Sequence, residues 1–254
     1  MLPSAFRRLP LAHRALHDVA EARPENSRAA IRAALSAGYG IEIDLQLSRD
    51  GQAMVFHDDD LRRLTGARGA VRQRDARALS GIPLRGGDGE CIPSLPEVLA
   101  LVAGRAPLLV ELKDQHGRLG ATDGALERAT AAALAGYRGP LAVMSFNPHM
   151  VAAMATLAPQ VPRGLVTCAY AAGDWPDLPA TTRDRLRAIP DYPRCGAAFI
   201  SHQAADLARA RVADLRGQGA MVLCWTIRSP RQEAAARRIA DNITFEGYLP
   251  AIPA

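Results

Sequence analysis

The sequence of 254 residues predicts an α/β protein, a TIM (β/α)8 barrel with a small insertion after its second strand. Eight apolar segments of strand length alternate with helical segments. Polar side chains follow the ends of the strand segments, where the active sites of such barrels lie. A doubly wound sheet would show a glycine-rich turn after its first strand, and this sequence has none there. We therefore expect one domain over residues 1–254, with residues 58–90 as a lobe inserted into it.

The individual elements follow from apolar periodicity and from the residues that bound each run. Strands are expected at residues 9–16, 39–47, 107–113, 140–145, 163–167, 197–201, 220–226 and 243–245. Helices are expected at residues 27–37, 94–102, 124–135, 148–157, 182–188, 206–218 and 230–240. Asn26 or Ser27 is the expected cap of the first helix, Gly38 its end, and Ser94 the cap of the second.

The strand at residues 39–47 carries the first chemical signal. Its side chains alternate, with apolar residues on one face and Glu42 and Asp44 on the other. A hairpin then returns along residues 53–56 and ends on His57, which brings an imidazole to the end of the same strand. A solvated surface strand would alternate in the same way, so this pattern alone leaves both interpretations open.

The strand at residues 107–113 has a similar design. It begins with an apolar run, typical of a strand buried on both faces, and ends with Glu111 and Lys113. Lys113 is the only lysine of the sequence, and we expect it where an arginine fork cannot replace a compact ammonium. Glu42, Asp44 and Glu111 together would form an all-oxygen site. Such a site suits Mg²⁺ or Ca²⁺, with Mn²⁺ as a further candidate.

Composition argues against several function classes. The net charge is +5, but the arginines are spread along the chain, and the denser stretch at residues 62–77 is interpreted as a solvated surface of the lobe. Aromatic residues are only 5%, so we expect no nucleic-acid binding. No apolar run reaches the roughly 20 residues that span a bilayer, and the first residues lack the apolar core of a signal peptide. We expect a cytoplasmic protein without stable membrane insertion.

The cysteines add no metal or disulfide signal. Four are present, and none belongs to a CxxC pair. They are Cys91, Cys168, Cys195 and Cys224. Reduced structural thiols are therefore expected.

The short motifs along the chain, in their order and spacing, resemble the glycerophosphodiester phosphodiesterase family of the bacterial cytosolic type. The resemblance covers nearly the whole sequence. The motifs are Ala12-His13-Arg14, Pro24-Glu25-Asn26-Ser27, Glu42-Ile43-Asp44, Asp50-Gly51, His57-Asp58, Leu61, Leu64-Thr65-Gly66, Ile92-Pro93-Ser94-Leu95, Glu111-Leu112-Lys113, Ser145-Phe146 and Trp225-Thr226.

This resemblance implies a metal-dependent barrel enzyme that hydrolyses glycerophosphodiesters, which are small-molecule substrates, to sn-glycerol 3-phosphate and an alcohol. The implied roles are metal binding by Glu42, Asp44 and Glu111, acid–base catalysis by His13 and His57, phosphoryl binding by Arg14 and Lys113, and substrate binding or packing at the mouth by Ser145 and Trp225. We hypothesise that His13 takes a proton from the nucleophile and His57 protonates the leaving alcohol, although the reverse assignment stays open. The roles of His202 and Glu246 and the oligomeric state, a homodimer included, are also open.

The sequence departs from the family pattern after its first strand and at its last one. Ala15 stands where a glycine is usual, so the backbone there is not expected to use angles that favour glycine. Thr244-Phe245-Glu246-Gly247 replaces a Thr-Asp pair at the last strand. Two other functions are kept as alternatives. One is a phospholipase of the same barrel type, C-like or D-like, acting on lysolipids or lipids, and the other is a non-catalytic phosphate-binding barrel.

Overall fold

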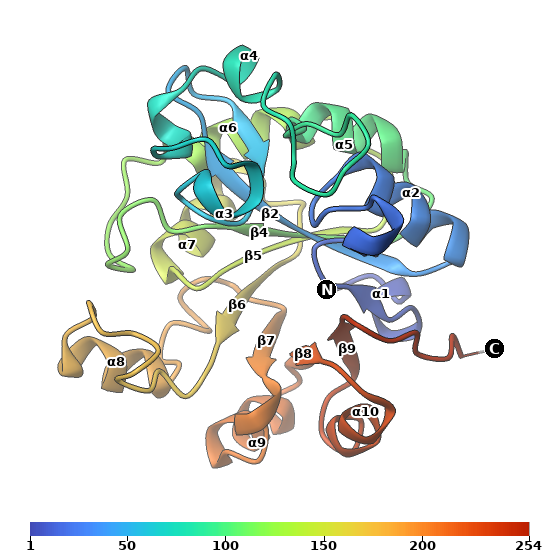
Figure 1. Cartoon of the computed structure of the whole chain (residues 1–254). Helices are drawn as coiled ribbons and strands as arrows, with labels where there is room; N and C mark the ends of the chain where they lie inside the picture. The colour runs from blue at the N-terminus through green and yellow to red at the C-terminus, as the bar shows by residue number, and fades with distance from the viewer. Residues whose placement is uncertain (254) are drawn as a thin grey trace.

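Eight parallel strands within residues 1–253 close into a barrel in the computed structural model, as the sequence predicted (Figure 1). The structure describes residues 1–253, so the last residue of the expected domain, Ala254, lies outside the described residues. In sheet order the strands are β1 (Leu11–Ala12), β2 (Gly40–Leu47), β4 (Leu108–Leu112), β5 (Leu141–Ser145), β6 (Arg163–Thr167), β7 (Phe199–Gln203), β8 (Met221–Ile227) and β9 (Asn242–Phe245). β1 closes the barrel because it pairs with both β2 and β9. An additional strand, β3 (Ala53–Val55), runs antiparallel to β2.

Most of the helices cover the outside of the barrel. They are α2 (Arg28–Ala37), α5 (Leu95–Val102), α6 (Ala125–Leu134), α7 (Pro148–Leu157), α8 (Ala180–Arg187), α9 (Ala210–Gly217) and α10 (Pro230–Ala236). The helix expected at 206–218 is divided into a 3-10 turn, η3 (Ala204–Asp206), and α9. Within residues 1–253, no helix combines the length and apolarity needed to cross a bilayer.

Local sequence signals define the ends of the first helices. The hydroxyl of Ser27 accepts a hydrogen bond from the amide of Ala30 at 3.1 Å, which makes Ser27 the cap of α2. Gly38 ends that helix in the left-handed conformation, with φ at +79°. Ser94 and Glu97 form a capping box at the start of α5.

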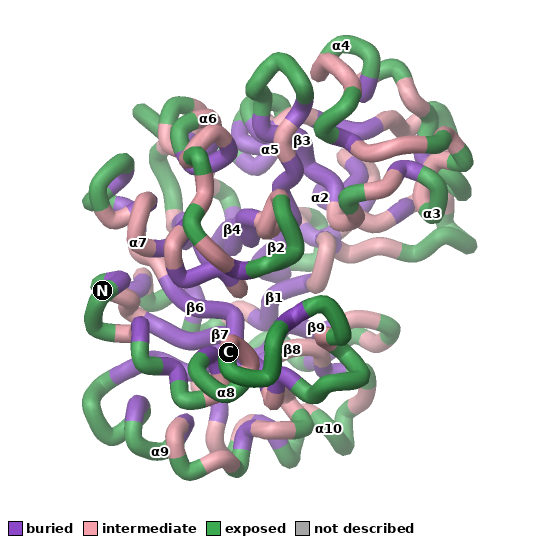
Figure 2. Tube along the Cα trace, turned by 90° about the vertical axis from the view of Figure 1, so that its left-hand side faces the viewer, coloured by how far each residue is buried: buried purple, intermediate pink, exposed green. Residues whose placement is uncertain are grey.

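The strands separate two apolar layers. In β2, Ile41, Ile43 and Leu45 pack outward against the helices. Residues of alternate register fill the interior of the barrel, namely Leu11, Leu109, Ala142, Met144, Val166, Phe199, Met221 and Leu223. Figure 2 shows this buried centre surrounded by more exposed connections.

The chain before and after β1 differs from the expected long first strand. A short helix, α1 (Ala5–Arg8), precedes β1 and places Phe6 in the interior cluster, at the amino-terminal end of the barrel. The strand ends at Ala12 because the following residues, Arg14 and Ala15, turn into the left-handed region. The amino-terminal end is thus filled with apolar side chains, and polar groups gather at the carboxyl end.

Residues 58–90 contain α3 (Arg62–Thr65), η2 (Val71–Gln73) and α4 (Ala76–Leu79). Their buried apolar side chains form a separate small cluster with the β3 hairpin. Its members are Met54, Phe56, Leu61, Val71, Leu79, Leu84 and Ile92. This cluster fixes the segment above the carboxyl end of β2.

Candidate active site

Three carboxylates from two neighbouring strands meet at the carboxyl end of the barrel. Glu42 and Asp44 come from β2 and Glu111 from β4, and these strands pair in a register that sets Asp44 beside Glu111. Each residue offers an oxygen within 4.8 Å of the others. The exposed fractions of the three residues are 1%, 1% and 6%. The structure therefore brings together the three acidic residues that the sequence singled out.

The ammonium of Lys113 lies beside two of these carboxylates. Its Nζ is 2.8 Å from Asp44 Oδ1 and 2.8 Å from Glu111 Oε1. Burial favours the protonated form of Asp44, but the positive charges of Lys113, His57 and Arg14 together outweigh burial and hold its pKa below the ordinary range. The pKa of Glu42 lies well above its ordinary value, because burial and then the charges of Asp44 and Glu111 disfavour the ionised form.

The cluster carries more negative charge than its neighbours neutralise. Three carboxylates face the single ammonium of Lys113, and the next nearest cation, Arg14, has its Nε 3.8 Å from Asp44 Oδ2. A further positive charge among these oxygens would relieve the repulsion that raises the pKa of Glu42. All the donors are hard oxygens, which match Mg²⁺ and Ca²⁺ better than zinc. The acidic triad thus fits a divalent metal ion.

A left-handed turn after β1 directs two backbone amides toward Glu42 of the acidic cluster. Arg14 and Ala15 have φ values of +53° and +63°. Ala15 therefore adopts the conformation that favours glycine, and the expectation drawn from the missing glycine was wrong. The amide of Arg14 donates to Glu42 Oε2 at 2.9 Å, and the amide of Ala15 donates to the Glu42 carbonyl at 2.9 Å. These two hydrogen bonds compensate for the strained backbone.

Asn26 orients Asp44 and does not cap α2. Its Nδ2 donates to Asp44 Oδ2 at 2.9 Å, and its Oδ1 accepts from the Asp44 amide at 3.3 Å. The side chain is 1% exposed. Asn26 is thus a support of the acidic cluster, and Ser27, the other residue expected as a cap, caps the helix.

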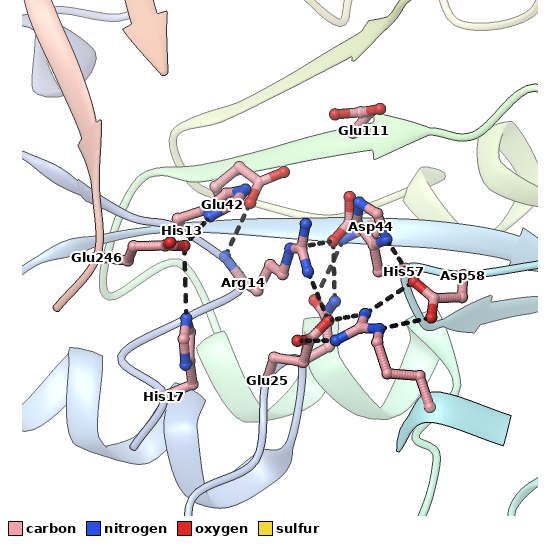
Figure 3. Close-up of polar contacts among 12 residues, drawn as sticks. His13, Arg14, His17, Glu25, Glu42, Asp44, His57, Asp58, Glu111 and Glu246 are labelled. Atoms are coloured by element: carbon pink, nitrogen blue, oxygen red, sulfur yellow. Dashed lines mark hydrogen bonds and ion pairs between the residues drawn. The ribbon is translucent and has the colours of Figure 1, made fainter. Parts of the chain in front are cut away.

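His13 faces a carboxylate that directly follows the last strand of the barrel. Its Nδ1 lies 2.5 Å from Glu246 Oε2, and Arg228 Nε donates to Glu246 Oε1 at 2.7 Å. His17 Nε2 lies 3.8 Å from the same carboxylate (Figure 3). Burial lowers the pKa of His13, and the hydrogen bond with Glu246 opposes that shift. Glu246, whose role was open in the sequence analysis, is therefore the direct partner of His13, a predicted site residue.

A chain of ion pairs links His57 to Arg14. His57 Nδ1 lies 2.8 Å from Asp58 Oδ1. Arg63 of α3 donates to both oxygens of Asp58 at 2.7 Å, and to the two oxygens of Glu25 at 2.8 and 2.9 Å. Glu25 also accepts from Arg14 Nη1 at 2.8 Å (Figure 3). Arg63 was expected among solvated arginines of the lobe, but it connects the lobe to both sides of the site.

These groups surround a cavity of about 170 Å³ at the carboxyl end of the barrel. The predicted site residues on its wall are His13, Arg14, Glu42, His57, Glu111, Lys113 and Trp225. Trp225 Nε1 donates to the carbonyl of Ser201 at 3.0 Å. The ring of Trp225 packs edge to face on Phe146, with 5.6 Å between the ring centroids. The polar atom of Trp225 is therefore occupied, and its ring contributes an apolar wall.

Ser145 and His202 lie away from this cavity. Ser145 is buried on the outer side of β5, where its hydroxyl donates to the Leu112 carbonyl at 2.6 Å and accepts from the Asn147 amide at 3.0 Å. The substrate-binding role expected for Ser145 is not retained, because its hydroxyl joins two segments of the fold. His202 is fully buried, with its ring nitrogens 2.7 Å from Thr167 Oγ1 and 3.1 Å from Asp206 Oδ2.

The chain is similar to known proteins over most of its length. Residues 13–244 match the model of the Glycerophosphoryl diester phosphodiesterase family. YhdW of Bacillus subtilis, named as a candidate glycerophosphodiester phosphodiesterase, is 26% identical over 244 residues, which are 92% of this chain and 90% of that protein. A glycerophosphodiester phosphodiesterase of Caldanaerobacter subterraneus is 30% identical over 151 residues, which are 56% of this chain and 61% of that protein.

Solved structures share the fold over almost its full length. A phosphodiesterase of Oleispira antarctica, determined in complex with the product sn-glycerol-3-phosphate, has a TM-score of 0.75 and 25% sequence identity to this chain. The superposition covers 94% of this chain and 93% of that one. The likeness therefore extends over the barrel as a whole.

Proposed function

Because the chain belongs to the glycerophosphoryl diester phosphodiesterase family, whose members hydrolyse glycerophosphodiesters, we propose that it releases sn-glycerol 3-phosphate and an alcohol by a metal-dependent, histidine-catalysed reaction. One observation carries the proposal. Two members of the buried acidic triad, Glu42 and Glu111, line the same small cavity as two imidazoles, those of His13 and His57. We also propose that the whole chain is one catalytic domain, with residues 58–90 as a lobe inserted into it.

The acidic triad is the proposed metal site. Glu42, Asp44 and Glu111 would hold one divalent cation, Mg²⁺ or Ca²⁺, since all three present buried carboxylate oxygens. When bound, this cation would neutralise negative charge on the phosphoryl oxygens as the phosphorus is attacked.

Two cationic side chains would hold the remaining phosphoryl charge. Lys113 is fixed by its contacts with Asp44 and Glu111 and lines the cavity. Arg14 is fixed by Glu25 and lines the opposite side of the acidic cluster. Their charges favour the phosphorane-like transition state over the free substrate, because negative charge on the oxygens is greatest there.

His13 and His57 are the proposed proton carriers. The contact of His13 Nδ1 with Glu246 leaves Nε2 free to accept a proton. In the proposed first step, the 2-hydroxyl of the glycerol attacks phosphorus, its proton passes to His13, the bond from phosphorus to the alcohol oxygen breaks, and His57 protonates that oxygen. Water then opens the cyclic phosphate, with the two histidines in exchanged roles. The lowered pKa of His13 keeps it in the neutral form that a base requires near neutral pH.

A substrate panel tests this function. The protein is incubated with several glycerophosphodiesters, a lysolipid and an intact phospholipid, each with Mg²⁺, Ca²⁺, Mn²⁺ or EDTA, and glycerol 3-phosphate is measured by an enzyme-coupled assay. We expect release from the soluble diesters that requires a divalent cation. Cleavage of the lipids alone would favour the phospholipase alternative, and phosphate-ester binding without release would favour the non-catalytic barrel.

A further inference from the structure

A wide groove opens directly from the catalytic cavity. Its volume is about 1150 Å³, against about 170 Å³ for the cavity itself. The two spaces share His57, Glu111, Lys113 and Phe146 on their walls. One side of the groove is formed by the inserted lobe and the other by the loop between β4 and α6. A substrate held at the acidic triad can therefore extend from the cavity into the groove.

The position of His57 indicates which half of the substrate lies in the groove. His13 and Trp225 line only the small cavity, whereas His57 lines both spaces. In the proposed reaction His57 protonates the leaving alcohol, so that alcohol lies on the groove side. The small cavity is then left for the glycerol phosphate half.

The walls of the groove offer free hydrogen-bonding groups of several kinds. Arg72 of η2 and Arg118 of the loop after β4 are exposed, and their guanidinium groups have no hydrogen-bond or ion-pair partner within residues 1–253. Asp59 and His116 are likewise exposed along the groove, as is Gln73, whose Oε1 accepts from the Ala70 amide at 3.2 Å and whose Nε2 remains available as a donor. Donors and acceptors of this variety match a molecule with several hydroxyl groups.

Two aromatic rings stand beside these polar groups. Phe146 and Trp175 line the groove with 5.1 Å between their ring centroids and an angle of 59° between their planes. Both side chains are half-buried, so part of each ring faces solvent. The faces of such rings pack well against the C–H groups of a sugar or a cyclitol.

The charges of the groove disfavour a cationic head group. Unpaired acidic groups would add to the attraction that aromatic rings exert on a quaternary ammonium, but Asp58 already pairs with Arg63 and His57. Asp114 accepts from Asn147 Nδ2 at 2.6 Å and from backbone amides of its own loop. Asp59 is the one carboxylate of the groove without a side-chain partner among residues 1–253, and two unpaired arginines, Arg72 and Arg118, line the same groove.

We propose that this groove binds the alcohol half of the substrate and selects a polyhydroxylated head group, uncharged or anionic, such as a sugar or a cyclitol. The inference rests on the proposed diesterase function. The groove has room for such a head group, because its volume is about 1150 Å³. Arg118 and Trp175 are then specificity-determining residues.

The test compares two substrates that release the same product. Glycerophosphoinositol and glycerophosphocholine are assayed separately, and kcat/KM is obtained from glycerol 3-phosphate release. We expect the inositol diester to be preferred by about tenfold or more. Arg118→Gln and Trp175→Ala should each lower kcat/KM for the inositol diester by about tenfold and change that for the choline diester by less than about twofold.

The control variant is Arg138→Gln, which alters an exposed arginine outside the groove that has no ion pair within the described part of the chain. It should leave both kcat/KM values unchanged. Arg118 is exposed, so its substitution removes a surface group without opening a cavity. The Arg118 variant therefore tests the proposal even if the Trp175 variant does not fold. Equal kcat/KM for both diesters, unchanged in the Arg118 variant, would overturn the groove proposal alone. Absence of glycerol 3-phosphate from every diester would instead overturn the diesterase function beneath it.

Discussion

Each proposed catalytic histidine is held through one ring nitrogen by a carboxylate. Glu246 holds His13, and Asp58 holds His57. In both cases Nδ1 is engaged and Nε2 remains for the substrate. Both imidazoles line the small cavity, but only His57 also borders the wide groove. This difference makes their roles separable by experiment.

We predict that His13→Ala and His57→Ala each lower kcat for a natural glycerophosphodiester by about 10² or more, because each removes a proton carrier. A substrate with p-nitrophenol as the alcohol needs no protonation of its leaving group. With that substrate His57→Ala should regain most of the lost rate, and His13→Ala should not. Steady-state kinetics with both substrates measure this. Recovery in the His13 variant instead would reverse the assignment of acid and base.

The carboxylate of Glu246 is predicted to position His13. Glu246→Gln keeps the shape of the side chain and removes its charge, so we expect kcat to fall by about tenfold or more with little change in KM. Because the hydrogen bond to Glu246 raises the pKa of His13, the variant should have a still lower pKa at His13. A base is active above its pKa, so the acidic limb of the pH profile should move to lower pH.

The matched control for this change is Glu233→Gln. Glu233 of α10 pairs with Arg237, the residue directly after that helix, away from the cavity. Its substitution should leave the pH profile unchanged. A Glu246→Gln enzyme with normal kcat and an unshifted profile would show that the contact with His13 has no part in turnover.

One short helix, α3, connects the inserted lobe to the barrel. α3 contributes Arg63, whose guanidinium forms paired hydrogen bonds with Asp58 and with Glu25. Burial favours the protonated form of each carboxyl, but the hydrogen bonds and charge of Arg63, together with Arg14 at Glu25 and His57 at Asp58, outweigh burial and hold both pKa values below their ordinary range. The same helix therefore positions a partner of His57 and a partner of Arg14.

Arg63→Gln should lower the free energy of unfolding by about 1–3 kcal/mol at pH 7, because two charged hydrogen-bond acceptors lose their donor. Carboxyls with a lowered folded-state pKa stabilise the protein above their unfolded-state pKa near 4, and this contribution is lost as pH falls toward the folded-state value. The difference between wild type and variant should thus shrink at about pH 3. Denaturant unfolding at both pH values measures it.

The neighbouring arginine provides the control for Arg63. Arg62 is exposed, and its side chain makes no hydrogen bond or ion pair within residues 1–253. Arg62→Gln should change the unfolding free energy by less than about 0.5 kcal/mol. If Arg63→Gln and Arg62→Gln behaved alike, the ion-pair chain would have no measurable role in holding the lobe.

Closure of the barrel couples the metal site to the stability of the molecule as a whole. β1 has only two residues, and it joins the first and last parts of the chain through β2 and β9. The turn that follows β1 is held by Glu42, one of the proposed metal ligands. Anything that stabilises the acidic cluster therefore stabilises the strand pair that closes the barrel.

We predict that a divalent cation at 100 times its Kd raises the free energy of unfolding by about 2.7 kcal/mol. For a chain of this size the midpoint of thermal unfolding should rise by about 5–10 °C. Differential scanning calorimetry with Mg²⁺, with Ca²⁺ and with EDTA measures the shift. Asp44→Asn should abolish it, whereas Glu21→Gln, at an exposed position outside the cluster, should retain it. An equal shift in the Asp44 variant would place the cation elsewhere.

The sequence alone predicted the order of strands and helices and the identity of the acidic triad. Apolar alternation reveals which side of a strand is buried, and in a parallel barrel all carboxyl ends of strands meet at one face. Glu42, Asp44 and Glu111 could therefore be grouped without coordinates. Ser27, Gly38 and Ser94 also marked their helix ends correctly, because capping depends on a few neighbouring residues.

Contacts between residues far apart in the sequence were decided only by the tertiary structure. Glu246 meets His13, and Arg63 joins Glu25 to Asp58, through side-chain directions that no local pattern encodes. Ser145 is the last residue of β5, and its outward position depends on the register of that strand. Local periodicity determines which residues form an element and which face they share. The packing of whole elements determines which side chains then meet, and that depends on the complete three-dimensional arrangement.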